Sequence, residues 1–128
     1  VRCMASAGCP DLPITDVLVL HHICPRARPQ KLGDICFVLN YEDAHVVAYS
    51  LKKLVAAKLA QTEKAGKEVF YSPTPAGDAA VQKYRAVREA CLVDNLDVEH
   101  NPDIGDLARL MRTMSGLYDQ AARAATSL

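Results

Sequence analysis

The sequence contains no tryptophan and few other aromatic residues, and it has no apolar run of the about 18 residues that a membrane-spanning helix requires. No basic stretch leads into an apolar segment and a small-residue cleavage site, so we expect no secretory signal. Common enzyme motifs are also missing: there is no nucleophile elbow, glycine-rich phosphate loop or HExxH sequence. We therefore expect a cytoplasmic protein that is not an enzyme, needs no cofactor and does not bind a membrane.

Paired cysteines are absent as well. The five cysteines are odd in number, widely spaced and without a CxxC pair, which argues against structural zinc. The adjacent His21 and His22 would point about 100° apart on a helix, so they are not expected to share a metal ion. Reduced, partly buried thiols are the simplest interpretation. A redox-sensing thiol with a low pKa is the alternative, with Cys36 and Cys91 as candidates.

The sequence does have many apolar residues and an uneven distribution of charge. Half of its 128 residues are hydrophobic, and long stretches rich in Ala and Leu lack Gly and Pro, so we expect one mainly helical domain. The formal net charge is zero, but residues 26–88 carry +5 and the remainder carries −5. A basic middle segment is typical of a surface that faces a polyanion such as double-stranded DNA.

Residues 13–24 and 30–39 are predicted to form two short helices. Pro13 suits the first turn of the first helix, and a Pro-Arg-Ala-Arg-Pro break separates the two. Helical spacing places a stripe of residues on one side of each helix. The stripes are Ile14, Val17, Leu18 and His21 in the first helix and Leu32, Ile35, Cys36 and Leu39 in the second.

A third helix is predicted at 41–58, capped by Asn40, with Asp43 completing an acidic variant of the capping box. Residues 59–72 change to a strand-like pattern and are predicted to form a β-hairpin with lysines at its tip. Another helix is expected at 76–92. The buried stripes of these two helices are predicted to be Val47, Leu51, Leu54 and Val55, and then Val81, Tyr84, Val87 and Cys91.

The last helix is predicted to begin at Asn101-Pro102 and to carry a coiled-coil seam, because its apolar residues alternate in steps of three and four. A helix with such a seam needs a partner. The candidates are the helix at 76–92, a segment preceding Val1, or the same helix of a second subunit. The seam consists of Ile104, Leu107, Met111, Met114, Tyr118, Ala121 and Ala125.

The predicted order of three helices, a β-hairpin and two helices is that of a winged helix-turn-helix. In this fold the third helix enters the major groove of DNA and the hairpin forms the wing. The expected fold is therefore mainly α with a small β-hairpin wing.

Residues 12–92 resemble the MarR family of winged-helix transcription regulators. LPITDVLVLHHI resembles the opening core helix of that family, and LGDICFVLNYEDAHVVAYSLKKLVAAKLAQ resembles the scanning helix, the turn and the recognition helix. SPTPAGDAAVQKYRAVREACL resembles the entry to the dimerisation helix after the wing. The phrases VRCM, DVLVLHH, EDAHVV and GKEVFYS are similar to a bacterial subgroup of predicted MarR-like regulators.

The resemblance implies three regions. Residues 1–12 would be the tail of an N-terminal dimerisation helix with a linker, 13–75 the DNA-binding domain, and 76–128 the C-terminal dimerisation helices. The sequence departs from the family in its wing, where only two lysines stand in place of the usual Asp-Arg-Arg type of cluster. Glu42 and Asp43, near the expected start of the recognition helix, would repel phosphate.

The resemblance and the basic middle segment together indicate which residues contact DNA. Lysines and arginines are expected at phosphates, whereas His45 and Tyr49 are expected at base edges. The candidate set is His45, Tyr49, Lys52 and Lys53 on the third helix, Lys64 and Lys67 on the wing, and Arg26 and Arg28 between the first two helices.

We therefore expect a homodimeric transcription regulator that binds DNA sequence-specifically through one recognition helix and one wing in each subunit. The resemblance also implies a pocket for a small apolar or aromatic effector. A winged-helix module that binds protein, and a thiol-based redox-sensing regulator, are the alternatives. The expected dimer interface contains Ile104, Leu107, Met111, Met114 and Tyr118.

Overall fold

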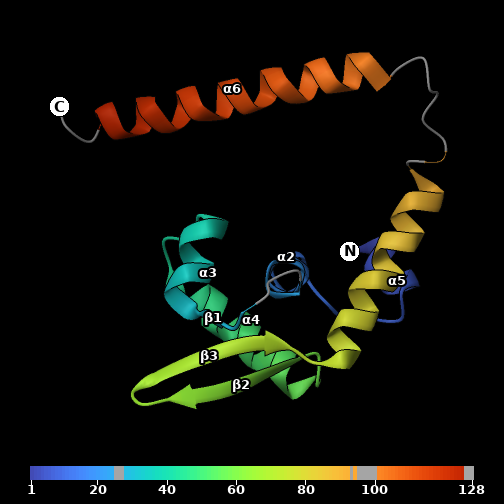
Figure 1. The fold of residues 1–128 in the computed structure, drawn as a ribbon, viewed down its shortest axis with the longest axis vertical. Coiled ribbons are helices and arrows are strands. Elements are labelled where there is room, and N and C mark those ends of the chain that lie inside the picture. Colours follow the sequence, from blue (N-terminus) through green and yellow to red (C-terminus); the bar gives the residue numbers. More distant parts are fainter. Residues whose placement is uncertain (25–27, 93, 95–100, 126–128) are drawn as a thin grey trace. The chain divides into compact units, whose positions relative to one another are not determined.

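The structure, a computed structural model, describes residues 1–24, 28–92, 94 and 101–125. Its elements follow the predicted order, with one short strand added. The helices are α1 (Arg2–Ser6), α2 (Ile14–Ile23), α3 (Leu32–Leu39), α4 (Ala44–Ala56), α5 (Pro75–Cys91) and α6 (Asn101–Ala125), and the strands are β1 (Gln30–Lys31), β2 (Ala60–Ala65) and β3 (Glu68–Pro73) (Figure 1).

The chain forms two compact units, Val1–Ala90 and Cys91–Leu128. In the first unit α2 packs against α3, α4 and β3, and α3 packs against α4 (Figure 1). This arrangement surrounds one apolar core, as expected for a winged helix-turn-helix. The largest fully buried apolar side chains of the core are Met4, Leu20, Ile23, Ile35, Leu51 and Leu54.

The predicted stripe of α2 is wrong at Ile14 and Leu18, which are exposed, and right at Val17, which is buried, and His21, which is partly buried. The buried residues of the helix are Asp16, Val17, Val19, Leu20, His22 and Ile23. Apolar residues lie all round α2, so the helical period selects no single face. Packing against several elements decides which side is covered. The stripes of the next two helices are confirmed, because the predicted residues of α3 and α4 pack in or against the core, although α3 also exposes Phe37 and Val38.

The predicted start and cap of the third helix are also wrong. Asn40 adopts the left-handed conformation (φ 55°, ψ 44°) and ends α3 rather than beginning α4. Helix α4 begins at Ala44, and the carboxylate of Asp43 accepts a hydrogen bond from the His45 N–H at 2.8 Å. Asparagine adopts left-handed geometry more easily than most residues. Asn40 therefore serves as the C-cap of the preceding helix.

The predicted hairpin is confirmed, and a third strand joins it to give the order β1-β3-β2. Strands β2 and β3 pair from Ala60 opposite Pro73 to Ala65 opposite Glu68, and Gly66 at the turn has a φ of +64°. The added strand β1 is held by Gln30 opposite Tyr71 and by an ion pair of 2.6 Å between Lys31 and Glu68. Two residues are too few to show an alternating pattern, so sequence analysis missed this strand.

A close contact fastens the beginning of α5 to the end of α4. The Thr74 hydroxyl donates to the Lys58 carbonyl at 2.7 Å and accepts from the Gly77 N–H at 3.1 Å. The Thr74 N–H donates to the Leu59 carbonyl at 3.1 Å. A Cβ atom on Gly77 would lie 2.0 Å from the same carbonyl oxygen. Only glycine therefore allows the two backbones to approach this closely.

His21 and Tyr84 join α2 to α5. The His21 Nδ1–H donates to the Val17 carbonyl at 2.8 Å, and the ring meets Tyr84 edge to face with 4.3 Å between centroids. Burial lowers the pKa of His21, and the charges of Arg85 and Arg88 add to this effect. His21 is therefore a neutral side chain in the packing between these helices near neutral pH.

The thiols of Cys24 and Cys36 are held in their protonated form. Burial, together with the charge of the Asp78 carboxylate and its hydrogen bond from the thiol, raises the pKa of Cys24 to about 12. Burial also raises the pKa of Cys36. A redox-sensing thiol needs the opposite, a lowered pKa and access to solvent. These two cysteines therefore lack the properties that the redox alternative requires, whereas Cys91 is exposed.

Helix α6 is the main element of the second unit. The apolar side chains that the sequence places on its seam are exposed, among them Met111 and Tyr118. Leu110 and Leu117 are exposed beside them, so the apolar stripe is wider than a strict coiled-coil seam. Neither α6 nor any other helix of the described residues combines the length and the apolar character needed to cross a membrane.

We predict that Gly77→Ala destabilises the protein by about 2 kcal/mol or more, because the added methyl overlaps a backbone oxygen that has little room to move. Urea unfolding followed by circular dichroism measures this change. Gly33→Ala on α3 is the matched control, since no atom lies within 4 Å of its added Cβ. The control should be neutral or stabilising. Equal effects of the two substitutions would refute the close contact.

We also predict that iodoacetamide modifies Cys24 at pH 8 at least about 100-fold more slowly in the folded protein than in urea, because its thiolate is scarce. Cys36 should be protected in the same direction. Mass spectrometry of the peptides gives the rate for each cysteine. In urea all five cysteines should react at similar rates. Rapid labelling of folded Cys24 or Cys36 would show that the thiol is ionised.

Candidate nucleic-acid interface

Helix α4 presents a polar stripe directly opposite its buried one. His45, Tyr49 and Lys52 follow each other at i, i+4 and i+7, so they lie on one face. All three are exposed, and Tyr49 is 67% exposed although it is a large aromatic residue. The opposite face, which includes Val47, Leu51 and Leu54, is buried in the core. The fold thus brings three of the predicted DNA contacts together on a single outward surface.

The start of α4 is not a free anion site. The Asp43 carboxylate occupies the position that a phosphate would take, because it already accepts the His45 N–H. Glu42 lies in the turn before the helix and is exposed. An approaching phosphate therefore meets a negative charge here, and cationic side chains farther along α4 and on the wing must attract it instead.

A shallow groove of about 380 Å³ runs along one side of α4, between that helix and the start of α2. Lys53 lies in this groove, and its ammonium forms an ion pair of 2.5 Å with the carboxylate of Asp16, which is almost fully buried. The Lys53 nitrogen also lies 5.7 Å from the centre of the Tyr49 ring. Lys53 thus differs from the neighbouring Lys52, which is exposed.

A second groove of about 350 Å³ runs between α4 and the wing. Ala48, Lys52 and Val55 contribute to it from α4, and Thr62 and Tyr71 from the two wing strands. Helix α4 is therefore a ridge with a groove on either side, one bordered by α2 and the other by the wing. A ridge with this form is suited to insertion into a wider groove of a partner such as DNA.

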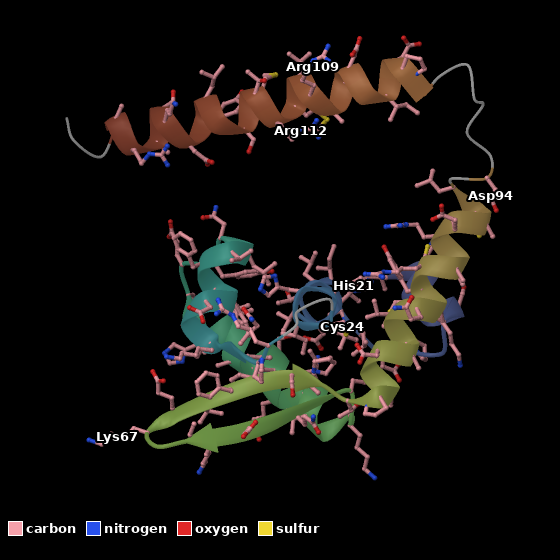
Figure 2. All side chains as sticks on the ribbon, in the orientation of Figure 1. His21, Cys24, Lys67, Asp94, Arg109 and Arg112 are labelled. Atoms are coloured by element: carbon pink, nitrogen blue, oxygen red, sulfur yellow. The ribbon has the colours of Figure 1, made fainter. Side chains whose placement is uncertain are left out.

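The wing presents its lysines to solvent. Lys64 is exposed on β2, and Lys67 is exposed at the turn and projects from the tip of the hairpin (Figure 2). Among the described residues no acidic side chain pairs with either lysine. Lys31 at the base of the sheet is different, because its ammonium is paired with Glu68 and lies 5.4 Å from the centre of the Phe70 ring.

One further predicted contact lies in the connection between α2 and α3. Arg28 is exposed just before β1, and its carbonyl accepts a hydrogen bond from the Gln30 side chain at 3.0 Å. Arg26 lies outside the described residues. The part of the chain that the structure covers contains no group of three or more His, Cys, Asp or Glu side chains that could hold a metal ion.

The residues of the predicted dimer interface all lie on α6. Arg109 and Arg112 project from the same helix, and Arg109 forms an ion pair with Asp106 (Figure 2). These charged residues lie off the seam, which leaves the apolar side chains continuous along the helix. Met114, Leu117, Tyr118 and Ala121 line a shallow hollow of about 260 Å³ on this surface.

Asp16, the buried partner of Lys53 beside the outward stripe of α4, was not among the residues predicted from the sequence. A signal for it exists, because Asp16 is the only Asp, Glu, Lys or Arg in residues 13–24, a segment that is otherwise mostly apolar. A single acid in such a helix must be paired if it is buried. The sequence does not show which cation pairs with it, since Lys53 lies 37 positions away.

Comparison with known families identifies the first unit. The sequence profile of the winged-helix DNA-binding domain matches residues 14–77, which include α2, α3, α4, both wing strands and the first turn of α5. That match covers half of the chain. No curated protein matches the sequence.

Solved structures share the fold over most of the chain. The RV1404 protein of Mycobacterium tuberculosis superposes with a TM-score of 0.72 at 15% identity, over 90% of this chain and 80% of its own. MepR, a transcription regulator of the multidrug efflux pump MepA of Staphylococcus aureus, superposes with a TM-score of 0.66 at 19% identity, over 91% of this chain and 87% of its own. BpsR of Bordetella bronchiseptica, whose DNA binding is regulated by 6-hydroxynicotinic acid, superposes with a TM-score of 0.64 at 21% identity, over 83% of this chain and 76% of its own.

The fold is thus the one that the MarR resemblance predicts, and the family model that matches is that of a winged-helix DNA-binding domain. The matched segment contains the outward stripe of α4 and the lysines of the wing. The chain therefore belongs to the winged-helix DNA-binding domain family.

Proposed function

We propose that this protein is a transcription regulator that binds a specific DNA sequence as a homodimer. The observation that carries the proposal is the outward stripe of His45, Tyr49 and Lys52 on α4. In winged-helix proteins the corresponding helix enters the major groove. A variant of MepR from Staphylococcus aureus has been solved bound to an oligodeoxyribonucleotide, and its fold is similar to that of this chain.

The side chains divide into two roles. Lys52, Lys64, Lys67 and Arg28 contact phosphates, which gives affinity and salt dependence without reading the sequence. His45 and Tyr49 read base edges, since they lie at the centre of the exposed face of α4 and can donate and accept hydrogen bonds there. Arg26 joins the phosphate contacts in this proposal.

A second candidate is a winged-helix module that binds protein instead of DNA. The capped, acidic start of α4 favours it, because Asp43 and Glu42 repel phosphate where other helices attract it. The lysines of the wing, with which no acidic side chain of the described residues pairs, favour DNA, and they lie on the same unit as the outward stripe of α4. We therefore place the DNA-binding function first.

Dimerisation belongs to α6 in this proposal. A helix that exposes Ile104, Leu107, Met111, Met114 and Tyr118 to water along one side is unstable alone and gains most by pairing with a copy of itself. The additional exposed Leu110 and Leu117 broaden the stripe beyond that of a two-stranded coil. Such breadth suits a bundle, in which α6 contacts more than one helix.

Control by a small apolar or aromatic effector is part of the proposal. Its support is the similarity to BpsR, for which 6-hydroxynicotinic acid regulates DNA binding. Thiol oxidation is a weaker route, because one of its two candidates, Cys36, is buried and has a raised pKa; the other, Cys91, is exposed.

We predict that the protein binds a random-sequence duplex of about 30 base pairs at low salt, with log K falling linearly as log salt rises. Lys52→Gln or Lys64→Gln should reduce the magnitude of the slope by about 0.9 per subunit, because one phosphate contact is lost. Fluorescence anisotropy at several salt concentrations measures the slope.

Lys83→Gln is the matched control, since it removes the same charge from an exposed position on α5 and should leave the slope unchanged. Absence of binding at low salt, or binding that is indifferent to salt, would favour the protein-interaction module instead.

We predict a dimer at micromolar concentration by light scattering coupled to size exclusion. Met111→Glu should convert the dimer to a monomer, because a charge would be buried in the apolar interface. Gln120→Glu adds the same charge away from the seam and should leave the dimer intact. A monomeric wild-type protein, or a dimeric Met111→Glu variant, would refute the interface.

A further inference from the structure

Two adjacent lysines on α4 have opposite surroundings. Lys52 is exposed, and no acidic side chain of the described residues pairs with it. Lys53 is only partly exposed, and its ammonium contacts the carboxylate of Asp16 at 2.5 Å. The Asp16 side chain is 3% exposed. The same type of residue, one position farther along the helix, is thus tied to the protein interior.

The ion pair connects two helices and an aromatic ring. Asp16 lies in the first turn of α2, and Lys53 lies in the last turn of α4. The Lys53 nitrogen is also 5.7 Å from the centre of the Tyr49 ring, one helical turn earlier on α4. A cation at this distance from an aromatic ring attracts it. All three side chains line the same groove, so Lys53 lies between the buried carboxylate and the exposed ring.

The burial of Asp16 fixes Lys53 in place. A buried carboxylate without a counter-charge is strongly unfavourable, and removing one partner of such a pair costs more than the pair itself contributes. If the Lys53 ammonium moved to a DNA phosphate, it would leave the Asp16 carboxylate unpaired. Lys52 can move to a phosphate without any such loss.

We propose that Lys53 is a positioning residue for DNA recognition rather than a phosphate contact. Held by Asp16, it fixes the Tyr49 ring on the outward face of α4, so that the reading of the DNA sequence depends on two residues that do not touch DNA. This inference rests on the proposed DNA-binding function and assigns Lys53 and Asp16 a role in its specificity.

The role has a measurable signature. Loss of a phosphate contact weakens binding to all sequences and reduces the salt slope by about 0.9 per subunit. Loss of a positioned base contact instead reduces discrimination between sequences and leaves the slope unchanged. Lys53→Met should therefore lower the preference for a selected duplex over a scrambled one by about tenfold, the effect of one base contact. Lys53→Arg should restore much of the preference, because it keeps the positive charge.

The experiment begins with duplexes selected from a random-sequence pool by the wild-type protein. Anisotropy titrations over a range of salt then give the slope and the ratio of affinities for the selected and scrambled duplexes. Lys52→Met is the matched control. It should have a smaller salt slope but an unchanged ratio of affinities for the selected and scrambled duplexes. Tyr49→Ala should lose the ratio, and adding Lys53→Met to it should cause no further loss, because both act through the same ring.

A structural fault is separated from loss of positioning by a second variant. Asp16→Asn combined with Lys53→Met removes both charges, so no buried carboxylate is left unpaired. This double variant should fold, which circular dichroism verifies, and it should still lose the sequence preference with an unchanged slope. Preserved preference in this variant would reduce the ion pair to a structural contact and overturn the inference.

The remaining outcomes distinguish failure of this inference from failure of the proposed DNA-binding function. If Lys53→Met reduces the salt slope as much as Lys52→Met does, Lys53 contacts a phosphate. That result would overturn this inference but not the proposed DNA-binding function. Losses that add when Tyr49→Ala and Lys53→Met are combined would do the same. If the wild-type protein binds neither duplex at low salt, the proposed DNA-binding function fails, and the inference fails with it.

Discussion

Burial of α2 is the constraint on which the first unit depends. This helix contributes Val19, Leu20 and Ile23 to the core, and α3, α4 and β3 all pack against it. Helix α5 joins it through Tyr84, whose ring meets that of His21. Since apolar burial supplies most of the stability of a small domain, the surrounding elements take their positions from this one helix. The outward stripe of α4 points away from the core because the other side of α4 must face α2.

This central position explains what sequence could and could not predict. The buried stripe of α4 was predicted correctly, because its apolar and polar residues alternate with the helical period. Stripe assignment failed for α2, since a helix that is apolar on all sides has no preferred face in its sequence. The two-residue strand β1 gives no pattern, and its pairing with Tyr71 and Phe70 depends on chain segments far apart in sequence. The order of the helices and the wing could be predicted, because each element is indicated by the pattern of residues within its own segment.

In the candidate site, too, some features could be predicted from local sequence and others depend on contacts between distant segments. His45, Tyr49 and Lys52 could be placed on one face from their spacing alone. The ion pair between Lys53 and Asp16 could not, because it joins residues from different helices that meet only in the folded chain. Asn40 and Asp43 were assigned to the wrong roles. Asn40 ends α3 and Asp43 begins α4, but residues of this type occur both at the end of one helix and at the start of the next, and here only a short turn separates the two. Local spacing thus identifies an exposed surface, whereas long-range pairing decides which of its charges are available.

The contact between Thr74, Gly77 and the end of α4 has a mechanical consequence. Thr74 is hydrogen-bonded to the carbonyls of both Lys58 and Leu59, and Gly77 leaves no gap against Leu59. The two ends of the hairpin and the first turn of α5 therefore form one stiff joint. A stiff joint transmits rotation instead of absorbing it. If α5 tilted, the hairpin would have to tilt with it, and Lys67 at the tip, which lies farthest from the joint, would be displaced most.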